Sequence, residues 1–520
     1  MPWPESDVDH VMVTSESMAI FEQELIKSGL EVASLMEKVG LAMADWILRQ
    51  KELIKNGVLI LVGPGHNGGD GLVVARELHH AGIKVAIWCP FPVRKNLTIN
   101  HLSHIRWLGI DELKYEPNVN ENILWIDALF GLNQKKPLPD FLEKLFKKRQ
   151  LSNPSKLICL DIPSGICSDS GMPINKVAAV GAFTLTAGLL KQGLIQDIAI
   201  PYVGKIIRIN LGITDKQIKR KENKFPLSIS PKDISTIPWP VMSPISMKYQ
   251  RGRVFVIAGS DSYRGASLLA LKGAIASGVG CIYAVLPNVV SDGLWQFAPE
   301  VILKGSLGKS SGGDIVNKYC LKGSDLDKVD VLLLGPGLVK SAFSFFDCLK
   351  ICEKFQGLLV LDADAINQLA GLSEGWHWLL RREGPTWLTP HSSEFSRLFP
   401  ELIGLSPLLA AKKAAEITGA SILLKGAHSV VAEPDGQIWQ LSQTAPWVAR
   451  AGWGDVLAGF VSGVGALGLA SSSGFHHNLL AAGTLMHSAA AFKCQEGSNA
   501  SLLGESLGAL VRGLQAKSCA

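Results

Sequence analysis

The sequence predicts an α/β protein made of two doubly wound domains, and two observations support this prediction. In each half of the chain, a short apolar strand ends in a glycine-rich turn that is followed by a helix and a second strand. The chain has 520 residues, more than a single hydrophobic core usually supports. Strands that alternate with helices form parallel sheets, and ligands bind where the strands of such sheets end.

The composition is that of a folded protein without a nucleic-acid partner. With 47% hydrophobic and 19% charged residues, the chain has enough apolar material for large cores and lacks the signature of disorder. Its 51 basic and 46 acidic residues leave a net charge of +5, which is too small over this length to favour nucleic acid.

The cysteines and the chain start predict a cytoplasmic location. Nine cysteines, an odd number, are scattered through the chain and fit reduced thiols better than a disulfide framework. The early residues are acidic and precede no basic region with an apolar run, so we expect no signal peptide. The most apolar region, residues 456–470, is shorter than a membrane span, so we expect no membrane partner.

The first half begins with two expected helices in residues 15–50 and continues with a glycine turn. An apolar strand over residues 57–61 leads into the run Gly-Pro-Gly-His-Asn-Gly-Gly-Asp-Gly at 63–71. A helix over 72–80 and a strand over 84–89 follow. This order of elements places a ligand site at the carboxyl end of the first strand.

Two later strands, over residues 123–126 and 157–160, also end in polar residues. Parallel strands end at one edge of the sheet, so their terminal side chains can share a pocket. Taken singly, each aspartate is better explained as a turn or cap residue, but three polar strand ends in one sheet weaken that explanation. Oxygen ligands of this kind suit a hard cation. The residues expected at this edge are Asn67, Asp70, Asp127, Asp161 and Ser164.

A change of character marks the boundary between the domains. Residues 216–224 are charged, and five prolines follow up to Pro244, a pattern typical of a linker. We therefore predict one domain over residues 1–220, a linker over 221–245, and a second domain over 246–520.

The second half repeats the alternation with different motifs. A strand over residues 253–258 ends at a glycine turn, and a helix over 267–277 and a strand over 281–286 follow. A hairpin is expected over 430–441, because Pro-Asp-Gly interrupts it. Four further strands end in glycine-containing or polar motifs, and they span 331–334, 358–361, 387–388 and 421–424.

The stretch from Ala449 to Gly459 is the centre of the second half. Its glycine-rich turn enters an apolar helix and places Asp455 in the first helical turn. Amide groups at such a helix start bind anions, so Asp455 would stand beside a phosphate and take a proton from a substrate hydroxyl. The alternative is that Asp455 only caps the helix. His391 is left open as either a substrate contact or a structural histidine.

The motifs of the first half resemble those of the epimerase domain of the NAD(P)H-hydrate repair enzymes, over residues 10–215. The resemblance rests on the 63–71 run, Asp-Ala-Leu-Phe-Gly at 127–131 and Asp-Ile-Pro-Ser-Gly at 161–165. It implies a Rossmann-like three-layer sandwich, K⁺ bound by Asn67, Asp127 and Ser164, and Asp161 as the catalytic acid/base. The implied substrate-binding residues are His66, Asn67, Gly68, Gly69, Asp70, Gly131, Leu132, Asn133 and Asp161.

Three positions depart from the motifs of that family. His66 stands where asparagine is usual, Leu132-Asn133 replaces Thr-Gly, and Lys38-Val39 interrupts the usual Met-Glu-Asn-Ala-Gly. A domain that has lost its activity and serves as a binding module therefore remains an alternative.

The motifs of residues 245–515 resemble the ribokinase-like NAD(P)H-hydrate dehydratases. They include Gly-Pro-Gly at 335–337, Leu-Thr-Pro-His at 388–391 and Gly-Asp-Val-Leu-Ala-Gly at 454–459. The resemblance implies ADP or ATP with Mg²⁺ and the catalytic residue Asp455. The implied substrate contacts are Ala266, Gly337, His391 and Asp455. The implied nucleotide-binding residues are Lys425, Gly426, Ala427, His428, Ser429 and Gly454. Arg450 and Trp453 depart from the family, which has small residues there.

Together these motifs predict a bifunctional enzyme that repairs damaged nicotinamide cofactors. It would epimerise R- and S-NAD(P)H hydrate and dehydrate the S epimer at the expense of an adenine nucleotide. The alternative is a small-alcohol kinase of the hydroxymethylpyrimidine type on the same fold. We also expect a homo-oligomer.

Overall fold

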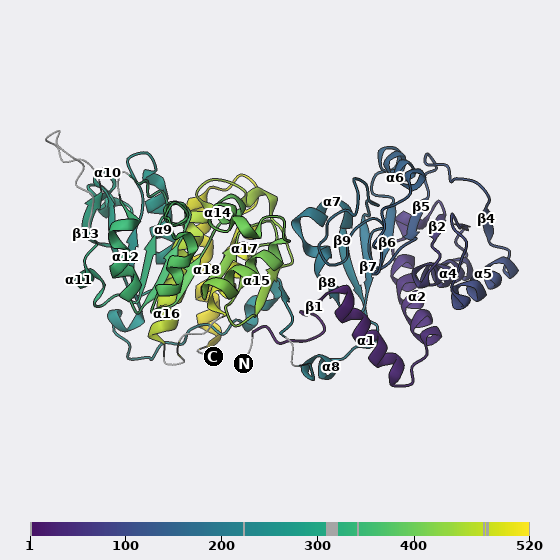
Figure 1. The fold of residues 1–520 in the computed structure, drawn as a ribbon, viewed down its shortest axis with the longest axis horizontal. Coiled ribbons are helices and arrows are strands. Elements are labelled where there is room, and N and C mark those ends of the chain that lie inside the picture. The colour runs from purple at the N-terminus through teal and green to yellow at the C-terminus, as the bar shows by residue number, and fades with distance from the viewer. Residues whose placement is uncertain are drawn as a thin grey trace. The chain divides into compact units, whose positions relative to one another are not determined.

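The computed structural model describes residues 3–221, 224–307, 321–340, 343–471, 474 and 478–518. The chain forms two compact units: Ser6–Pro226, called the N-terminal unit, and Met1–Glu5 together with Leu227–Ala520, called the C-terminal unit. Both units are built on largely parallel sheets that alternate with helices along the chain (Figure 1). The predicted fold class is therefore confirmed.

The N-terminal unit has, among its described residues, a parallel seven-stranded sheet in the order β4-β3-β2-β5-β6-β7-β9. The strand order reverses at β2, which lies between β3 and β5, so a topological switch point lies there. The strands are β2 (Val58–Val62), β3 (Val85–Trp88), β4 (Asp111–Leu113), β5 (Leu124–Ala128), β6 (Leu157–Leu160), β7 (Phe183–Ala187) and β9 (Lys205–Ile209), with β1 (Met12–Val13) pairing β8 (Leu190–Lys191) separately. The α-helices are α1 (Ser15–Lys27), α2 (Val32–Leu48), α3 (Lys51–Ile54), α4 (His66–His80), α5 (Asn96–Trp107), α6 (Asp140–Ser152), α7 (Ile200–Val203) and α8 (Asp215–Lys219).

The structure corrects two predicted boundaries around the glycine-rich run. Helix α4 begins at His66 rather than at residue 72, so the run forms the first turns of the helix. A methyl group on Gly68 would lie 2.1 Å from the carbonyl oxygen of Gly63, and one on Gly69 would lie 2.5 Å from Met36 Cε. These two glycines therefore let the helix start pack closely. Strand β5 includes Asp127, which had been expected to follow the strand.

The C-terminal unit has a ten-stranded sheet among its described residues, in the order β10-β19-β18-β17-β16-β15-β14-β11-β12-β13. Its pairs are parallel except for β17-β18 and β18-β19, and the latter pair is the predicted hairpin. The strands are β10 (Leu227–Ile229), β11 (Arg253–Ile257), β12 (Cys281–Pro287), β13 (Ile302–Leu307), β14 (Val331–Leu334), β15 (Leu358–Leu361), β16 (Thr386–Leu388), β17 (Ser421–Leu424), β18 (Val430–Ala432) and β19 (Ile438–Leu441). The α-helices are α9 (Arg264–Ala276), α10 (Asn288–Ser291), α11 (Gly323–Leu326), α12 (Phe345–Lys354), α13 (Ala363–Ala370), α14 (Ser392–Leu398), α15 (Pro407–Thr418), α16 (Trp453–Ala470), α17 (Leu479–Cys494) and α18 (Ala500–Ser518).

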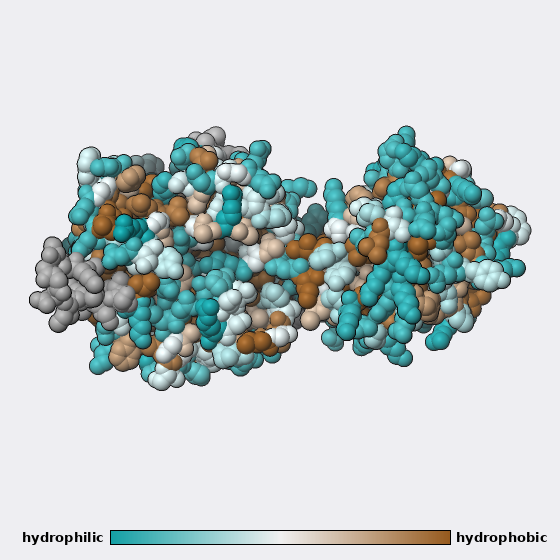
Figure 2. All heavy atoms as spheres, turned by 90° about the horizontal axis from the view of Figure 1, so that it is seen from above, coloured by the Kyte–Doolittle hydropathy of each residue, from teal (hydrophilic) through white to brown (hydrophobic). Residues whose placement is uncertain are grey.

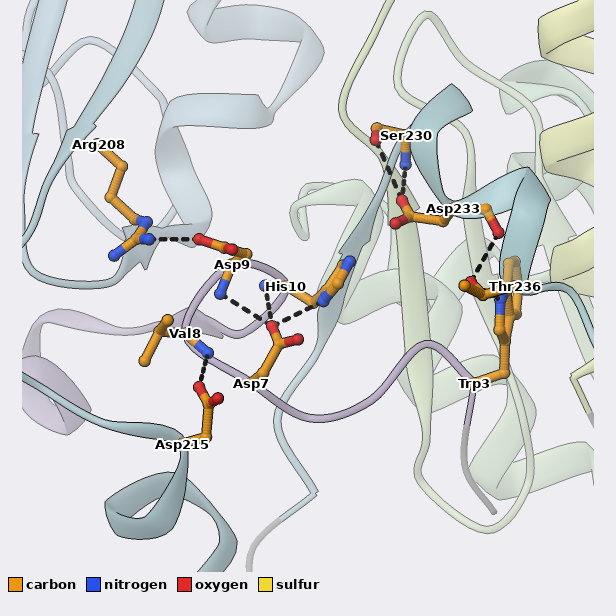
Figure 3. Close-up of polar contacts among 10 residues, drawn as sticks. All are labelled: Trp3, Asp7, Val8, Asp9, His10, Arg208, Asp215, Ser230, Asp233 and Thr236. Carbon is orange, nitrogen blue, oxygen red and sulfur yellow. Dashed lines mark hydrogen bonds and ion pairs between the residues drawn. The ribbon is translucent and has the colours of Figure 1, made fainter.

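The predicted linker is wrong over most of its length, and so is the assignment of the chain start to the first domain. Residues 227–229 form β10, which pairs in parallel with β19, and Pro231–Thr236 form a 3₁₀ helix, η3. Trp3 is buried in the same unit, where its Nε1 donates to Thr236 Oγ1 at 3.2 Å (Figure 3). Pro226 and Pro231 therefore lie in packed chain, because their neighbours supply β-pairing and burial, whereas Val241 and Ile245 further along are exposed.

Residues 7–10, by contrast, pack within the N-terminal unit. The amide of Val8 donates to Asp215 Oδ1 at 3.0 Å, and Arg208 pairs with Asp9 (Figure 3). The chain thus passes between the units twice, once after residue 5 and once after residue 226.

Helix α16 is long and apolar enough to cross a membrane by length and composition, contrary to the sequence estimate for residues 456–470. The helix gains length because Trp453–Asp455 form its first turn. In the described structure 78% of it is buried, as expected for the central helix of a packed unit. Its length and composition alone are therefore weak evidence for a membrane span.

The surface offers scattered hydrophobic side chains. The face of the N-terminal unit seen in Figure 2 is mostly hydrophilic, with hydrophobic residues interspersed. Trp107, Tyr115 and Leu151 are strongly exposed but belong to different segments. Single exposed apolar residues are normal on a protein surface and do not indicate a binding site.

Close contact between α9 and α16 fixes the position of the glycine-containing motif at 454–459. A methyl group on Gly459 would lie 1.8 Å from the carbonyl oxygen of Ala270, and one on Gly273 would lie 2.0 Å from that of Val456. Because the obstructing atoms belong to backbones, the helices must separate to admit any side chain.

We predict that Gly459→Ala destabilises the C-terminal unit by about 1–3 kcal/mol, the usual effect of overpacking. Differential scanning calorimetry of the full chain should show a lower Tm for one transition only. The control is Gly513→Ala in α18, where a methyl group meets nothing within 4 Å; the better helix former should leave stability equal or higher. Equal Tm values for Gly459→Ala and the wild type would contradict the packing argument.

Candidate active sites

A cavity of about 580 Å³ lies at the carboxyl ends of the central strands in the N-terminal unit. Gly131 lies close to both Asp161 and Asn67, since a methyl group on it would lie 3.3 Å from Asp161 Oδ2 and 3.4 Å from Asn67 Cβ. The predicted convergence of strand ends is thus present. The predicted residues that line the cavity are His66, Asn67, Asp70, Gly131, Leu132, Asn133 and Asp161. Gly68, Gly69, Asp127 and Ser164 are not among the lining residues.

Asp161 is held in an unusual conformation by a buried ion pair. Its φ is +63°, a region that non-glycine residues seldom adopt and that often marks functional sites. Its Oδ1 accepts from Lys191 Nζ at 2.6 Å, and its Oδ2 accepts from the amide of Leu132 at 3.1 Å. The Lys191 side chain is only 1% exposed. These two contacts fix the position of the Asp161 carboxylate at the cavity.

Lys191 was missed by the sequence analysis. Its only signal is a lone lysine within the apolar segment 188–195, and most lysines in such a context are solvated. The pairing arises because β8 carries Lys191 beside the end of β7, where it also donates to Thr186 Oγ1 at 3.0 Å. That neighbourhood is set by the fold and not by local sequence.

Behind the cavity wall, Asp127 and Ser164 form a buried polar cluster. Ser164 donates through Oγ to Asp127 Oδ1 at 2.7 Å and through its amide to Oδ2 at 2.8 Å. Burial raises the pKa of Asp127 to about 6, against the opposing effect of these hydrogen bonds. Asn67 Oδ1 is buried and has no hydrogen-bond partner among the described residues. This part of the unit therefore holds a buried carboxyl group and a buried amide oxygen that has unused acceptor capacity.

Two further carboxyl groups line the same cavity. Burial, followed by the proximity of Asp161 and Glu22, raises the pKa of Asp70 well above its ordinary value. Burial, followed by Asp161, also raises the pKa of Glu22. Glu22 comes from α1 and was not predicted, because nothing in the local sequence separates it from the other glutamates of that helix.

In the C-terminal unit, a second buried lysine-aspartate pair lies where the strands end. Lys425 Nζ donates to Asp362 Oδ1 at 2.7 Å, and Thr389 Oγ1 donates to the same oxygen at 2.7 Å. Burial acts to lower the pKa of Lys425, but Asp362 and Glu394 outweigh it and the net shift is upward. The Lys425 ammonium, which was predicted to contact a nucleotide, is thus paired with Asp362 in this structure.

Asp455 lies beside this pair in the first turn of α16. The N-cap of α16 is Gly452, with φ +88°, so the alternative that Asp455 merely caps the helix is wrong. Within the described residues its carboxyl group has no hydrogen-bond or ion-pair partner. Burial, followed by Asp362, raises the pKa of Asp455 to about 7, while Lys425 opposes the shift. A group with this pKa can accept and release protons near neutral pH.

The other predicted residues of this unit lie around the same strand ends. A methyl group on Gly337 would lie 2.7 Å from Ala266 Cβ, and one on Gly454 would lie 3.6 Å from Lys425 Nζ. His391 caps α14, accepting from the amide of Ser393 at 3.1 Å, and its side chain is half exposed. The capping role does not exclude a substrate contact. Residues 426–429 form a turn closed by the Ser429 hydroxyl.

The departures at Arg450 and Trp453 have a structural explanation. Trp453 is buried, so its bulk fills the core, and the Arg450 guanidinium lies 5.1 Å from its ring centroid. His487, also missed by the sequence analysis, lies 3.1 Å from the carbonyl oxygen of Trp453 through Nε2. Burial lowers the pKa of His487 to about 4, so the neutral ring donates this bond and anchors the helix start.

Each unit thus brings aspartates and a buried lysine together where the strands of its sheet end, which is where enzymes of the α/β class bind their substrates. Comparison with known proteins agrees. The family described as NAD(P)H-hydrate dehydratase matches residues 254–511, and the YjeF-related protein N-terminus matches residues 32–193.

Relatives match along both units. The bifunctional NAD(P)H-hydrate repair enzyme Nnr of Gloeobacter violaceus is 36% identical over 86% of this chain and 88% of its own. The enzyme of the same name from Synechocystis sp. is 35% identical over 87% of this chain and 85% of its own. The solved structure of the ADP/ATP-dependent NAD(P)H-hydrate dehydratase from Bacillus subtilis covers 56% of this chain and 100% of its own, with 24% identity and a TM-score of 0.43.

The chain belongs to the family of bifunctional NAD(P)H-hydrate repair enzymes. The dehydratase predicted for its second half and the epimerase-type first half are confirmed with it.

We predict that Lys191→Met destabilises the N-terminal unit by about 3 kcal/mol, because removing one member of a buried ion pair leaves the other charge uncompensated. Thermal unfolding should show a lower Tm for that unit alone. The control is Lys55→Met, which breaks an exposed pair with Glu52 and should change stability by less than about 0.5 kcal/mol. Equal effects of the two substitutions would show that the Lys191 pair is not a stabilising contact.

Proposed function

We propose that the N-terminal unit interconverts the R and S epimers of NAD(P)H hydrate and that the C-terminal unit dehydrates the S epimer at the expense of ADP or ATP. The observation that carries this proposal is the unpaired Asp455 carboxyl group in the first turn of α16, with a pKa of about 7. It stands beside helix-start amides that suit a phosphate.

For the dehydratase, Asp455 takes the proton of the substrate hydroxyl as the oxygen attacks the terminal phosphorus of the nucleotide. The bond from that phosphorus to its bridging oxygen breaks, and AMP or ADP leaves. The carbon-oxygen bond of the phosphorylated ring then breaks with the help of the ring nitrogen lone pair. Phosphate departs, and loss of a proton from the neighbouring carbon restores the dihydropyridine.

We assign nucleotide binding to Lys425–Ser429 and Gly454, and substrate contacts to Ala266, Gly337, His391 and Asp455. Gly454 suits this role because it leaves open space beside Lys425 Nζ. The ion pair with Asp362 would then hold the Lys425 ammonium in position beside the transferred phosphate. Mg²⁺ would arrive with the nucleotide, since no cluster of three or more histidine, cysteine or carboxylate groups among the described residues is placed to hold a metal ion, and Mg²⁺ commonly binds through substrate phosphates.

For the epimerase, we assign Asp161 as an acid/base that touches the substrate. Its ion pair with Lys191 holds the carboxylate in place at the cavity. We assign substrate contacts to His66–Asp70 and Gly131–Asn133, of which Gly68 and Gly69 act by allowing the close approach of α4.

The residues Asn67, Asp127 and Ser164 fit a K⁺ ion. Asn67 Oδ1 is a buried acceptor without a partner among the described residues, and Asp127 is fully buried and accepts from the neutral Leu129 amide, Ser164 amide and Ser164 hydroxyl. A buried carboxylate of this kind is stabilised by a cation. When bound, K⁺ would supply positive charge that fixes the cavity wall.

The relatives match across both units, so the small-alcohol kinase with an inactive first domain is not retained. The homo-oligomer and the cytoplasmic location stay predictions.

The function is tested by two matched substitutions. Asp455→Asn should abolish NAD(P)H recovery from both epimers, while Asp161→Asn should lower recovery only from the R epimer to its spontaneous rate. Absorbance of the dihydropyridine, with ADP or ATP and Mg²⁺, measures both. Because Asp455 must be ionised and its pKa is raised to about 7, the dehydratase rate of the wild type should fall as the pH decreases through 7. Recovery from the R epimer that is unchanged by Asp161→Asn would remove that assignment.

We predict that K⁺ raises the Tm of the N-terminal unit relative to choline at equal ionic strength, because binding to the folded state alone stabilises it. Asp127→Asn should remove the difference. Differential scanning calorimetry checks this without any measurement of activity. A shift of equal size in the variant would show that the ion acts elsewhere.

A further inference from the structure

One face of α1 lines the cavity of the N-terminal unit. Ala19, Glu22, Gln23 and Ile26 are its lining residues, at the i, i+3, i+4 and i+7 spacing of one helical stripe. A second stripe, Met18, Phe21 and Leu25, is buried and anchors the helix. Glu22 is therefore the one ionisable group that α1 presents to the cavity.

The other charged groups of α1 are accounted for differently. Glu24 pairs with Lys221, and Glu16 lies in the exposed first turn. Glu22 has no hydrogen-bond or ion-pair partner among the described residues, although it is half-buried. Burial raises the pKa of Glu22, Asp161 adds to the shift and Lys191 opposes it, so this carboxyl group keeps its proton more readily than one in water.

Glu22 also lies near a second carboxyl group, Asp161, which differs from it by having an ion-pair partner. Asp161 is paired with the buried Lys191 ammonium and acts on the pKa of Glu22 as its strongest charged neighbour. Two carboxyl groups in one site with different environments can hold different protonation states, which separates an acid from a base. Glu22 enters from α1 and Asp161 from the end of β6, so they approach the cavity from different elements.

We propose that Glu22 is a second catalytic residue of the epimerase, donating a proton to the departing hydroxyl group while Asp161 accepts one from the incoming water. The proposal rests on the epimerase function assigned above and adds a residue to it. Helix α1 precedes the span over which the N-terminal family matches, residues 32–193.

The step balances as follows. The ring nitrogen lone pair expels the hydroxyl group, which takes the Glu22 proton and leaves as water, so that one carbon-oxygen bond breaks and a cationic ring forms. A second water adds to the opposite face of the same carbon and gives its extra proton to Asp161. One water leaves, one enters, and no electrons are gained or lost overall. The proton returns from Asp161 to Glu22 through solvent, and the reverse reaction exchanges the two roles.

Asp70 is the rival for the acid, because it lines the same cavity and also lacks a partner among the described residues. The Asp70 carboxyl group lies close enough to Asp161 and Glu22 for both to raise its pKa. The experiment must therefore separate the two residues.

The test uses the full chain with Glu22→Ala, Glu22→Gln and Asp70→Ala. Epimerase activity is the rate of NADPH recovery from the R epimer above the spontaneous rate, with ADP, Mg²⁺ and added Asp161→Asn enzyme as a supply of dehydratase. We expect Glu22→Ala to lower the epimerase kcat by about 100-fold, the lower range for a lost general acid, with KM within about twofold. Formate, which fits the space left by the side chain, should restore at least about tenfold in Glu22→Ala.

The matched control is Glu24→Ala, the same change two residues along the same helix and outside the cavity lining. Its epimerase rate should stay within about twofold of the wild type and should not respond to formate. The Tm of the N-terminal unit, measured by differential scanning calorimetry, reports whether that unit has folded in each variant, and dehydration of the S epimer reports on the other unit. Glu22→Gln, which keeps the shape of the side chain, should lose activity as Glu22→Ala does.

A second measurement tests the step itself. Without nucleotide, epimerisation in H₂¹⁸O should place one ¹⁸O in each inverted molecule, because the leaving water is replaced from solvent. Retention of the original oxygen at inversion would overturn the step.

The outcomes separate this proposal from the assigned function. A wild type with no epimerase activity would remove the epimerase assignment as a whole. Activity in the wild type that Glu22→Ala or Glu22→Gln leaves unchanged would overturn the role of Glu22 alone. Loss without formate rescue would overturn the acid assignment, and rescue in Asp70→Ala but not in Glu22→Ala would transfer it to Asp70.

Discussion

A lysine ammonium buried beside an aspartate at a strand end is the interaction on which both sites depend. Lys191 pairs with Asp161 at 2.6 Å and Lys425 pairs with Asp362 at 2.7 Å. A carboxylate taken out of water needs such compensation, because its desolvation costs several kcal/mol by usual estimates. Beside each pair lies an unpaired acid, Glu22 or Asp455, whose pKa is raised by burial and then by the aspartate of the pair, while the lysine opposes the shift. The pairs therefore set the proton chemistry of their surroundings.

The glycines decide where these groups meet. Gly68 and Gly69 allow α4 to begin directly after β2, which brings Asn67 and Asp70 to the cavity. Gly273 and Gly459 let α9 and α16 come into backbone contact, which fixes the first turn of α16 beside Lys425. In both units a close helix approach replaces a loop, so the functional side chains sit on rigid elements. Rigid placement favours catalysis because it limits the reorganisation needed during the reaction.

Much of the fold follows from local pattern. The strands at 157–160, 331–334, 358–361 and 421–424 have the predicted limits, because runs of valine, leucine and isoleucine bounded by polar turns leave little choice in a sheet covered on both faces. The boundary regions were less predictable. Residues 227–236 look like a linker by their prolines but pack as β10 and η3, and Trp3 belongs to the C-terminal unit through contacts more than 200 residues away in sequence.

The amino-acid sequence by itself determined the two-domain α/β architecture, the position of Asp161 after a strand and of Asp455 in the first turn of a helix, and the family, because periodicity and motif spacing are local properties. Only the tertiary structure decided which charges meet. Lys191, Glu22 and His487 carry no distinguishing local signal, and the groups that act on them come from other elements. Asp161 pairs with Lys191 and raises the pKa of Glu22, and the Trp453 carbonyl accepts from His487. Burial and proximity across elements decide these contacts, and neither quantity exists until the chain has folded.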